Sequence, residues 1–388
     1  MNLDYRNAAA DRSGARLGAS RGFTLIELLV VITIIGVLAG LVLPAINGAV
    51  RAARESAVAS EITLLEQSLA SFKTRMGDFP PSFFVIDESG LYMNNTALVN
   101  AVANHFKTVG GMTNQTQIAT QTQKAIERSQ RMARKLFNRA APQQDVNGDG
   151  AVTSYWILEG DECLVFFLGG IPRTYNDPNS GLSYELTGFC KRPDTPLFGR
   201  NESNKATLNR DTPFFEFKAD RLVDFDNDGF PSYIDSLGTE EESRPYVYFS
   251  AYGANSYDPQ DCNYNPQVSY TPSLGGVSDE TTMPAQPYAR VFGGSAGVSL
   301  SPNPYTTGPA YPIGRSPAWQ KPQSYQIISA GADRKYGFGG QFAGKTKTEP
   351  LPLPDADVSA TGRINPQSPT ARNIESDNIT NFSQGRLN

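Results

Sequence analysis

One apolar stretch near the N terminus constrains this chain more than any other feature. From Phe23 to Ile46 it reads FTLIELLVVITIIGVLAGLVLPAI, with a single charged residue, Glu27. About 20 apolar residues in a helix match the hydrocarbon thickness of a bilayer, because each residue adds 1.5 Å. The sequence therefore predicts a membrane-spanning helix.

The charges before this stretch predict its orientation. Residues 1–22 carry Arg6, Arg12, Arg16 and Arg21 against two aspartates. Positively charged flanks stay in the cytoplasm, so we expect a single-pass protein of the inner membrane whose C-terminal body lies outside the cytoplasm. A secretory signal peptide fits less well, because the charged region is long and no small-residue cleavage site follows a short apolar core.

Glu27 requires an explanation, because a carboxylate in a spanning helix costs about 2.5–3.5 kcal/mol on insertion scales and is usually functional. The segment RGFTLIELLVVITIIGVLAGLVLP resembles the type IV prepilin signature, which pilins share with the pseudopilins of type II secretion. The MGDFPPS segment that follows the helix resembles the major pseudopilins in particular.

This resemblance implies roles for four residues. A prepilin peptidase would cut between Gly22 and Phe23, and the new Phe23 amine would be methylated. Glu27 would pair with the Phe23 amine of a neighbouring subunit, since an opposite charge stabilises a buried carboxylate. Pro44 stands where pilin helices often carry a proline, and it is expected to kink or locally melt the helix.

An apolar stripe continues the helix beyond the bilayer. Its residues are spaced by three or four positions and are Val58, Ile62, Leu65, Leu69, Phe72 and Met76. Gly77 and the prolines at 80 and 81 then end the helix. The expected fold class is α+β, a pilin-like ladle with a long N-terminal helix packed on an antiparallel sheet and with large loop-rich insertions.

We expect four segments along the chain. They are a cleaved leader over 1–22, a transmembrane and filament-core helix over 23–46, its amphipathic continuation over 47–77, and an extracytoplasmic globular domain over 78–388. Within that domain, helices are predicted at Asn95–Phe106 and Thr120–Arg139, and strands at Tyr155–Leu158, Cys163–Leu168, Phe214–Phe217, Tyr246–Ala251 and Tyr325–Ala330.

Two acidic loops follow the calcium-ligand pattern, with oxygen ligands at alternate positions and a glycine at the sixth. The first acidic loop, residues 145–156, carries Asp145, Asn147 and Asp149, and the second, residues 224–235, carries Asp224, Asp226, Asp228 and Asp235. The second matches better, because Asp235 occupies the twelfth position, where Trp156 stands in the first. The alternative is a pair of metal-free Asx turns.

A third candidate calcium site follows from resemblance. SYQIISAGADRKYGFGG, followed by SDNITNFS, resembles the closing segment of major pseudopilins, in which a loop binds calcium. Asp333 matches an aspartate of that segment, whereas Asn378 stands where the family has another.

The composition argues against several function classes. The net charge is −5, and without residues 1–22 it is −7, so nucleic acid is an improbable partner. A single histidine leaves little material for His-based catalysis or zinc binding. Of three cysteines, Cys163 reads as a core residue, and Cys190 and Cys262 are the more plausible disulfide pair.

The sequence thus predicts a structural subunit of a type II secretion pseudopilus or a type IV pilus, and no enzyme. Its expected partners are other copies, other pilin-like subunits, the prepilin peptidase and an inner-membrane assembly platform. It would lie in a periplasmic pseudopilus or a surface pilus. The alternative is a membrane-tethered or filament-tip adhesin or ligand-binding module, in which the insertion from Leu91 to Ser324 binds the ligand.

Overall fold

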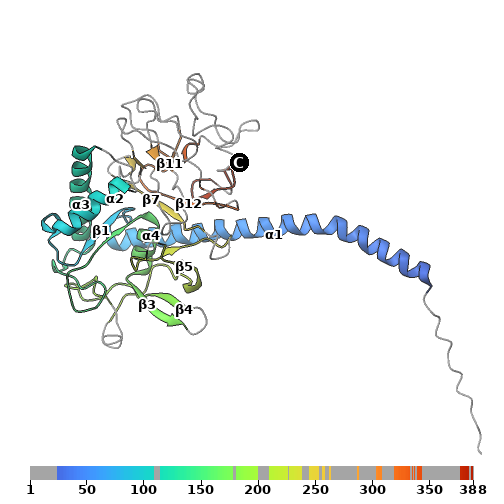
Figure 1. Ribbon diagram of the computed structural model, residues 1–388, viewed down its shortest axis with the longest axis horizontal. Coiled ribbons are helices and arrows are strands. Elements are labelled where there is room, and N and C mark those ends of the chain that lie inside the picture. The colour runs from blue at the N-terminus through green and yellow to red at the C-terminus, as the bar shows by residue number, and fades with distance from the viewer. Residues whose placement is uncertain are drawn as a thin grey trace, which may run out of the picture. The chain divides into compact units, whose positions relative to one another are not determined.

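The computed structural model describes residues 24–108, 114–177, 181–199, 209–225, 227–237, 244–252, 256–257, 262–263, 286–287, 303–307, 319–332, 334, 336, 339–342, 376–383 and 386–387. The chain divides into two compact units, Met1–Ala52 and Ala53–Asn388. Helix α1 contributes to both units, and the second unit also contains the remaining helices and the strands (Figure 1).

Helix α1 (Leu25–Met76) is 52 residues long and agrees with the predicted helix to within two residues at its start. Its backbone stays helical through position 44, so it does not melt there. Gly77 follows the helix with φ +85°, and its N–H donates to the Lys73 carbonyl at 2.8 Å. Glycine adopts this left-handed conformation without steric cost, which explains the helix end.

The predicted apolar stripe of α1 packs within the second unit, buried at five positions and partly buried at Met76. Val58, Ile62, Leu65, Leu69 and Phe72 are each at most 2% exposed. They share one core with the apolar helix α4 (Gly160–Gly169) and with residues of the central sheet. The second half of α1 is therefore an amphipathic helix, as its 3–4 spacing predicts.

The central sheet has four antiparallel strands in the order β14-β12-β7-β8. They are β7 (Val247–Tyr252), β8 (Ser256–Tyr257), β12 (Tyr325–Ser329) and β14 (Ile379–Thr380). Side chains alternate between two cores, because successive residues of a strand point to opposite faces. Tyr248 and Ile327 join the core that contains the α1 stripe, whereas Phe249 and Ile328 join a second core. Both faces of the sheet are thus covered.

Two helices and a strand pair form a third core. Helices α2 (Thr96–Thr108) and α3 (Gln115–Leu136) pack near β1 (Phe84–Asp87), which pairs antiparallel with β2 (Tyr155–Leu158). Short pairs complete the described strands: β3 (Pro172–Asp177) with β4 (Gly181–Leu186), β5 (Leu222–Val223) with β6 (Ser232–Tyr233), β9 (Cys262–Asn263) with β10 (Gln286–Pro287), and β11 (Asn303–Thr306) with β13 (Gly339–Gln341). The fold class is α+β, as predicted.

Three predictions for the body were wrong. Residues 163–168 lie in helix α4 and do not form a strand, because Glu159 and Glu162 form a capping box that starts a helix there. The fully described segment from Phe214 to Phe217 contains no strand. Cys190 is a buried free cysteine, so it does not form the expected disulfide with Cys262.

Candidate functional site

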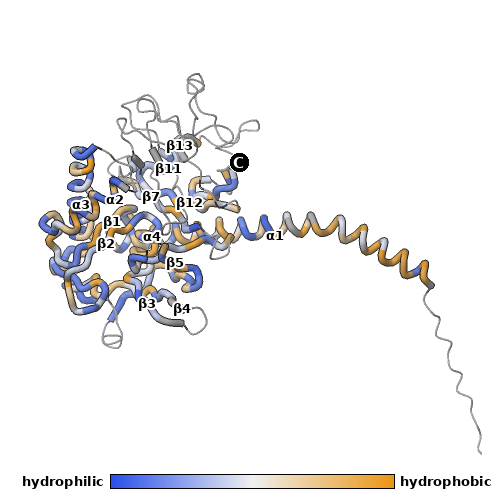
Figure 2. The backbone as a smooth tube through the Cα atoms, viewed as in Figure 1, coloured by the Kyte–Doolittle hydropathy of each residue, from blue (hydrophilic) through white to orange (hydrophobic). Residues whose placement is uncertain are grey.

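The N-terminal half of α1 presents apolar side chains to solvent on all sides. Leu25, Ile26 and Leu41 are 82%, 69% and 71% exposed, and Figure 2 shows this part of the helix as strongly hydrophobic. Its most apolar 18 residues have a mean hydropathy of 2.8, and none is buried. By length and composition the helix can cross a membrane. An exposed apolar surface of this size needs lipid or other protein to cover it.

Glu27 lies in the first turn of this helix and is bound by Thr24. The backbone N–H and the hydroxyl of Thr24 both donate to Oε2 of Glu27, each at 2.8 Å. This pair caps the first turn, where N–H groups lack helical partners. Because both bonds go to Oε2, the carboxylate has a defined orientation at the helix start. The predicted cleavage residues Gly22 and Phe23 lie outside the described residues, as does the side chain of Pro44.

A second carboxylate of α1, Glu61, is held inside the body. Arg221 donates to both of its oxygens at 2.7 Å, and the hydroxyls of Tyr233 and Tyr246 donate at 3.0 and 2.6 Å. Burial opposes ionisation of Glu61, but these hydrogen bonds and the guanidinium charge outweigh it and lower its pKa. Burial, and then the charge of Glu61, raise the pKa of Tyr246 well above its usual range. Glu61 is therefore an ionised anchor between α1 and the body.

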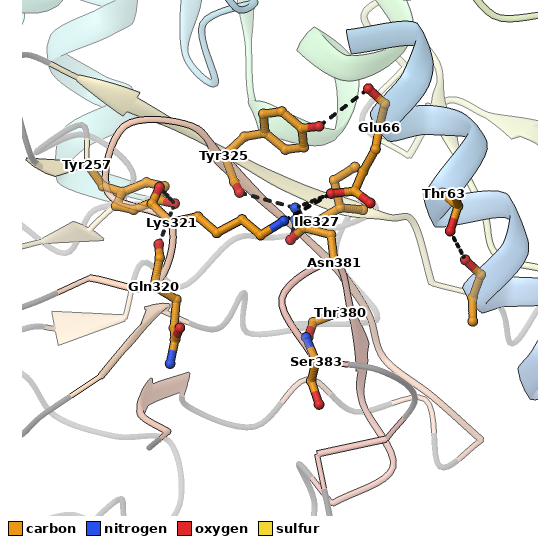
Figure 3. Close-up of polar contacts among 11 residues, drawn as sticks. Thr63, Glu66, Tyr257, Gln320, Lys321, Tyr325, Ile327, Thr380, Asn381 and Ser383 are labelled. Carbon is orange, nitrogen blue, oxygen red and sulfur yellow. Dashed lines mark hydrogen bonds and ion pairs between the residues drawn. The ribbon is translucent and has the colours of Figure 1, made fainter. Parts of the chain in front are cut away.

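The C-terminal segment meets α1 at a third carboxylate, Glu66. Lys321 and the amide of Asn381 both donate to Oε1 of Glu66, at 3.2 and 3.1 Å (Figure 3). The Tyr325 hydroxyl donates to the Glu66 carbonyl at 3.4 Å. Eleven residues earlier in α1, Glu55 forms an ion pair with Arg386. These contacts join residues of the C-terminal part of the body to α1.

The first acidic loop has well-defined Asx turns. Oδ2 of Asp145 accepts from the Gly150 N–H at 3.0 Å, and Asn147 and Asp149 hydrogen-bond each other at 2.9 and 3.0 Å. The Glu88 side chain holds the backbone of this loop, since it accepts hydrogen bonds from the N–H groups of residues 146, 147 and 154. Sequence reasoning missed Glu88, because nothing in the spacing connects it to a loop 57 positions later.

The second acidic loop is organised differently. Asp224 accepts from the backbone N–H groups of 227, 228 and 229 and from the Tyr184 hydroxyl, at 2.7–3.3 Å. Asp235 is buried, and its carboxylate accepts from the Ser329 hydroxyl at 2.6 Å and from the Leu237 N–H at 3.0 Å. Burial raises the pKa of Asp235. Asp226 lies outside the described residues. The predicted twelfth ligand thus contacts strand β12.

The two acidic loops are neighbours. The indole N–H of Trp156, at the end of the first loop, donates to the Asp228 carbonyl of the second at 3.1 Å. Asn147, Trp156, Arg173 and Asp228 line a cavity of about 350 Å³. Among the residues that the structure describes, no three His, Cys, Asp or Glu side chains form a group able to hold a metal.

The predicted C-terminal calcium site is only partly described. Asp333 lies outside the described residues, whereas Asn378 is fully buried. The Asn378 amide donates to the Tyr305 hydroxyl at 3.1 Å and to the Tyr336 carbonyl at 2.8 Å. This residue joins β14 to the second core through those two tyrosines.

Comparisons with known proteins match part of this chain. The family described as the prokaryotic N-terminal methylation motif matches residues 18–43. The type II secretion system core protein G of Klebsiella michiganensis is 42% identical over 65 residues, which is 17% of this chain and 46% of that protein. The corresponding proteins of Escherichia coli and Pectobacterium carotovorum are 45% identical over 60 residues and 43% over 80, or 41% and 51% of their lengths.

The chain therefore spans about half the length of the curated relatives that it matches. We found no solved structure that matches it. The matched family covers the start of α1, including Glu27 and its partner Thr24. This chain carries the prokaryotic N-terminal methylation motif at residues 18–43 and, over 60 to 80 residues, is similar to the type II secretion system core protein G.

Proposed function

We propose that this chain is a structural subunit of a type II secretion pseudopilus that assembles through the N-terminal half of α1. The observation that carries the proposal is the combination of the methylation motif with an unburied apolar helix. Packed side by side with the same helix of other subunits, this surface would stay out of water when the helix leaves the bilayer, and exposing it would cost about 25 cal/mol for each Å² of apolar surface. No catalytic step is part of this function.

In this proposal, a prepilin peptidase removes residues 1–22 and the Phe23 amine is methylated. Before assembly the helix spans the inner membrane, with the body outside the cytoplasm, since the four arginines lie ahead of it. An assembly platform in that membrane then transfers the subunit to a filament of pilin-like subunits.

Glu27 pairs with the Phe23 amine of the neighbouring subunit. Its carboxylate is oriented by Thr24 through Oε2. In the apolar filament core, an uncompensated charge on either group is costly, and pairing the two removes that cost. The pair therefore sets the register between adjacent helices.

The body is displayed by the second half of α1, in a ladle-like arrangement. Glu61 contacts Arg221, and Glu55 and Glu66 contact the C-terminal segment through Arg386 and Asn381. Such anchoring lets the helix carry a large extracytoplasmic domain as one unit.

The proposal is tested by processing and incorporation in the host. Mass spectrometry of the purified protein should find an N-methylated Phe23 at its N terminus. Glu27→Ala should be cleaved normally but largely fail to enter filaments, as measured in the sheared-fibre fraction. Thr33→Ala is the matched control in the same helix, because the Thr33 hydroxyl bonds only to the Leu29 carbonyl one turn earlier.

Two results would contradict the proposal. One is an intact Met1, or a cut beyond Leu43, in cells with an active peptidase. The other is normal incorporation of Glu27→Ala. Deletion of the gene distinguishes this function from that of an adhesin. Loss of protein secretion would indicate a pseudopilin. Loss of surface binding with normal secretion would indicate an adhesin.

A further inference from the structure

The first acidic loop contains a buried carboxylate oxygen without a hydrogen-bond partner. Asp145 is 9% exposed, and its Oδ1 has neither solvent contact nor a donor within reach. Its other oxygen, Oδ2, accepts from the Gly150 N–H, so the carboxylate points across its own loop. A buried anionic oxygen that lacks a donor costs several kcal/mol, and such an atom usually has a ligand.

The other candidate metal ligands of the loop are also oxygen atoms. Asn147 and Asp149 follow Asp145 at alternate positions, and their side chains hydrogen-bond to each other at 2.9 Å. Gly148 and Gly150 have φ of +72° and +88°, a left-handed conformation that lets the backbone turn this sharply. The loop backbone is therefore already folded around its own centre.

Glu88 fixes both ends of this loop. Fully buried at the end of β1, it accepts from the N–H groups of Val146 at 2.7 Å, Asn147 at 3.3 Å and Ser154 at 2.9 Å. Its hydrogen bond to the Val146 N–H places a second carboxylate beside the backbone that follows Asp145. The hydrogen bonds described for Asp145, Asp149 and Glu88 all come from neutral N–H groups, so the charge of the three carboxylates is not compensated there.

We propose that the first acidic loop is a calcium site, with Asp145, Asn147, Asp149 and the carbonyl of Ala151 as protein ligands. Calcium takes six to eight oxygens from carboxylates, amides, backbone carbonyls and water in flexible geometry, which this donor set matches. Magnesium demands a smaller octahedral site, and zinc favours nitrogen and sulfur, which the loop lacks. Glu88 acts as a positioning residue that holds the loop and adds charge.

The structure favours this loop over the second one, in contrast to the sequence pattern. At the first position of each loop, Asp145 has a buried oxygen without a hydrogen-bond partner, whereas both oxygens of Asp224 accept hydrogen bonds, including one from Tyr184. Asp235, the expected twelfth ligand, binds Ser329. The inference goes beyond the proposed pseudopilin function and does not depend on it.

The test uses the full-length chain in detergent micelles and Tb³⁺ as a probe that replaces Ca²⁺. Trp156 lines the same cavity as Asn147, so excitation of this indole should sensitise Tb³⁺ emission. Calcium should displace the probe at lower concentration than magnesium, and it should raise the melting temperature. Trp156→Phe should lose the emission but retain the calcium-dependent melting shift.

Asp145→Asn is the decisive variant, because it keeps the shape and the acceptor for Gly150 but removes the charge. It should weaken calcium binding at least tenfold, and Glu88→Gln about 10- to 100-fold. Asp220→Asn is the matched control, because Asp220 is exposed and lies outside both acidic loops. This variant should bind calcium with wild-type affinity. If Asp145→Asn folds poorly, Asp149→Asn at an exposed position carries the same test.

The inference is overturned if Asp145→Asn and Asp149→Asn retain wild-type affinity. It is also overturned if Asp228→Asn in the second loop abolishes the shift while Asp145→Asn does not. Equal displacement of the probe by magnesium rules out the calcium assignment. Because cleavage and filament assembly are not measured, these results leave the pseudopilin proposal unaffected.

Discussion

Replacing Glu61 by glutamine tests how α1 is anchored in the body. The side chains of Glu61 and Arg221 are only 14% and 11% exposed, and two hydrogen bonds of 2.7 Å join them. Glutamine keeps the shape and one carbonyl acceptor but leaves the guanidinium without its counter-charge. Removing one partner of a buried pair costs about 3–5 kcal/mol, so we expect a loss of about 3 kcal/mol in the free energy of unfolding.

Glu66→Gln on the same helix is the matched control. Glu66 and its partner Lys321 are 28% and 38% exposed, and pairs near the surface contribute about 0–1 kcal/mol. Urea unfolding of the full-length chain in detergent, followed by near-ultraviolet circular dichroism of the tyrosines, measures both variants. Equal losses in the two variants would refute the argument that desolvation makes the Glu61 pair the stronger anchor.

The pH dependence provides a second measurement on the same variants. Hydrogen bonds from Arg221 and Tyr246 lower the pKa of Glu61 against the opposing effect of burial. A lowered pKa means that the stabilisation is present above the usual glutamate value of about 4.3 and is lost as the pH falls through the folded value. Wild type should therefore lose stability more steeply than Glu61→Gln below about pH 4.3.

Three further predictions follow from the packing and from the helix start. Phe72→Ala should lower the free energy of unfolding by about 3–5 kcal/mol, since Phe72 is fully buried against the rings of Phe167 and Phe214; a loss below about 1 kcal/mol would contradict this packing. Cys190 should resist alkylation in the folded protein and react after urea unfolding, as peptide mass spectrometry can measure; recovery of a Cys190–Cys262 disulfide would contradict the free thiol. Thr24→Val should leave cleavage after Gly22 intact but reduce filament incorporation, because Glu27 loses the hydroxyl that orients it; incorporation at the wild-type level would show that this hydroxyl is dispensable.

The fold could be predicted where one periodicity dominates. The stripe from Val58 to Phe72 has a helical period, and the structure buries it as expected. The run from Cys163 to Leu168 is apolar at every position, so periodicity does not distinguish a strand from a buried helix. The capping box of Glu159 and Glu162 is a local signal that favours a helix, and it explains why the segment does not form the predicted strand.

The candidate sites were predictable only where the chemistry is local in sequence. The methylation motif is one continuous run, residues 18–43, and the Asp145 turn of the first acidic loop joins residues five positions apart. Asp235 is hydrogen-bonded by Ser329, 94 positions away, and Glu61 by Arg221, 160 positions away. Such pairs depend on tertiary packing, which propensity and spacing do not encode.

The contacts of α1 with residues far along the chain also determine when its packing can be completed during synthesis. Arg386 lies 331 positions after Glu55, its partner on the helix. At about 5–20 residues per second, a ribosome delivers that arginine roughly 17–66 s after the glutamate. During this interval the stripe from Val58 to Phe72 has left the ribosome without the segments that later cover it. The cover of the stripe is incomplete until residues of β12 and β14, such as Ile327 and Ile379, have been synthesised, and any slowing of translation before them prolongs that exposure.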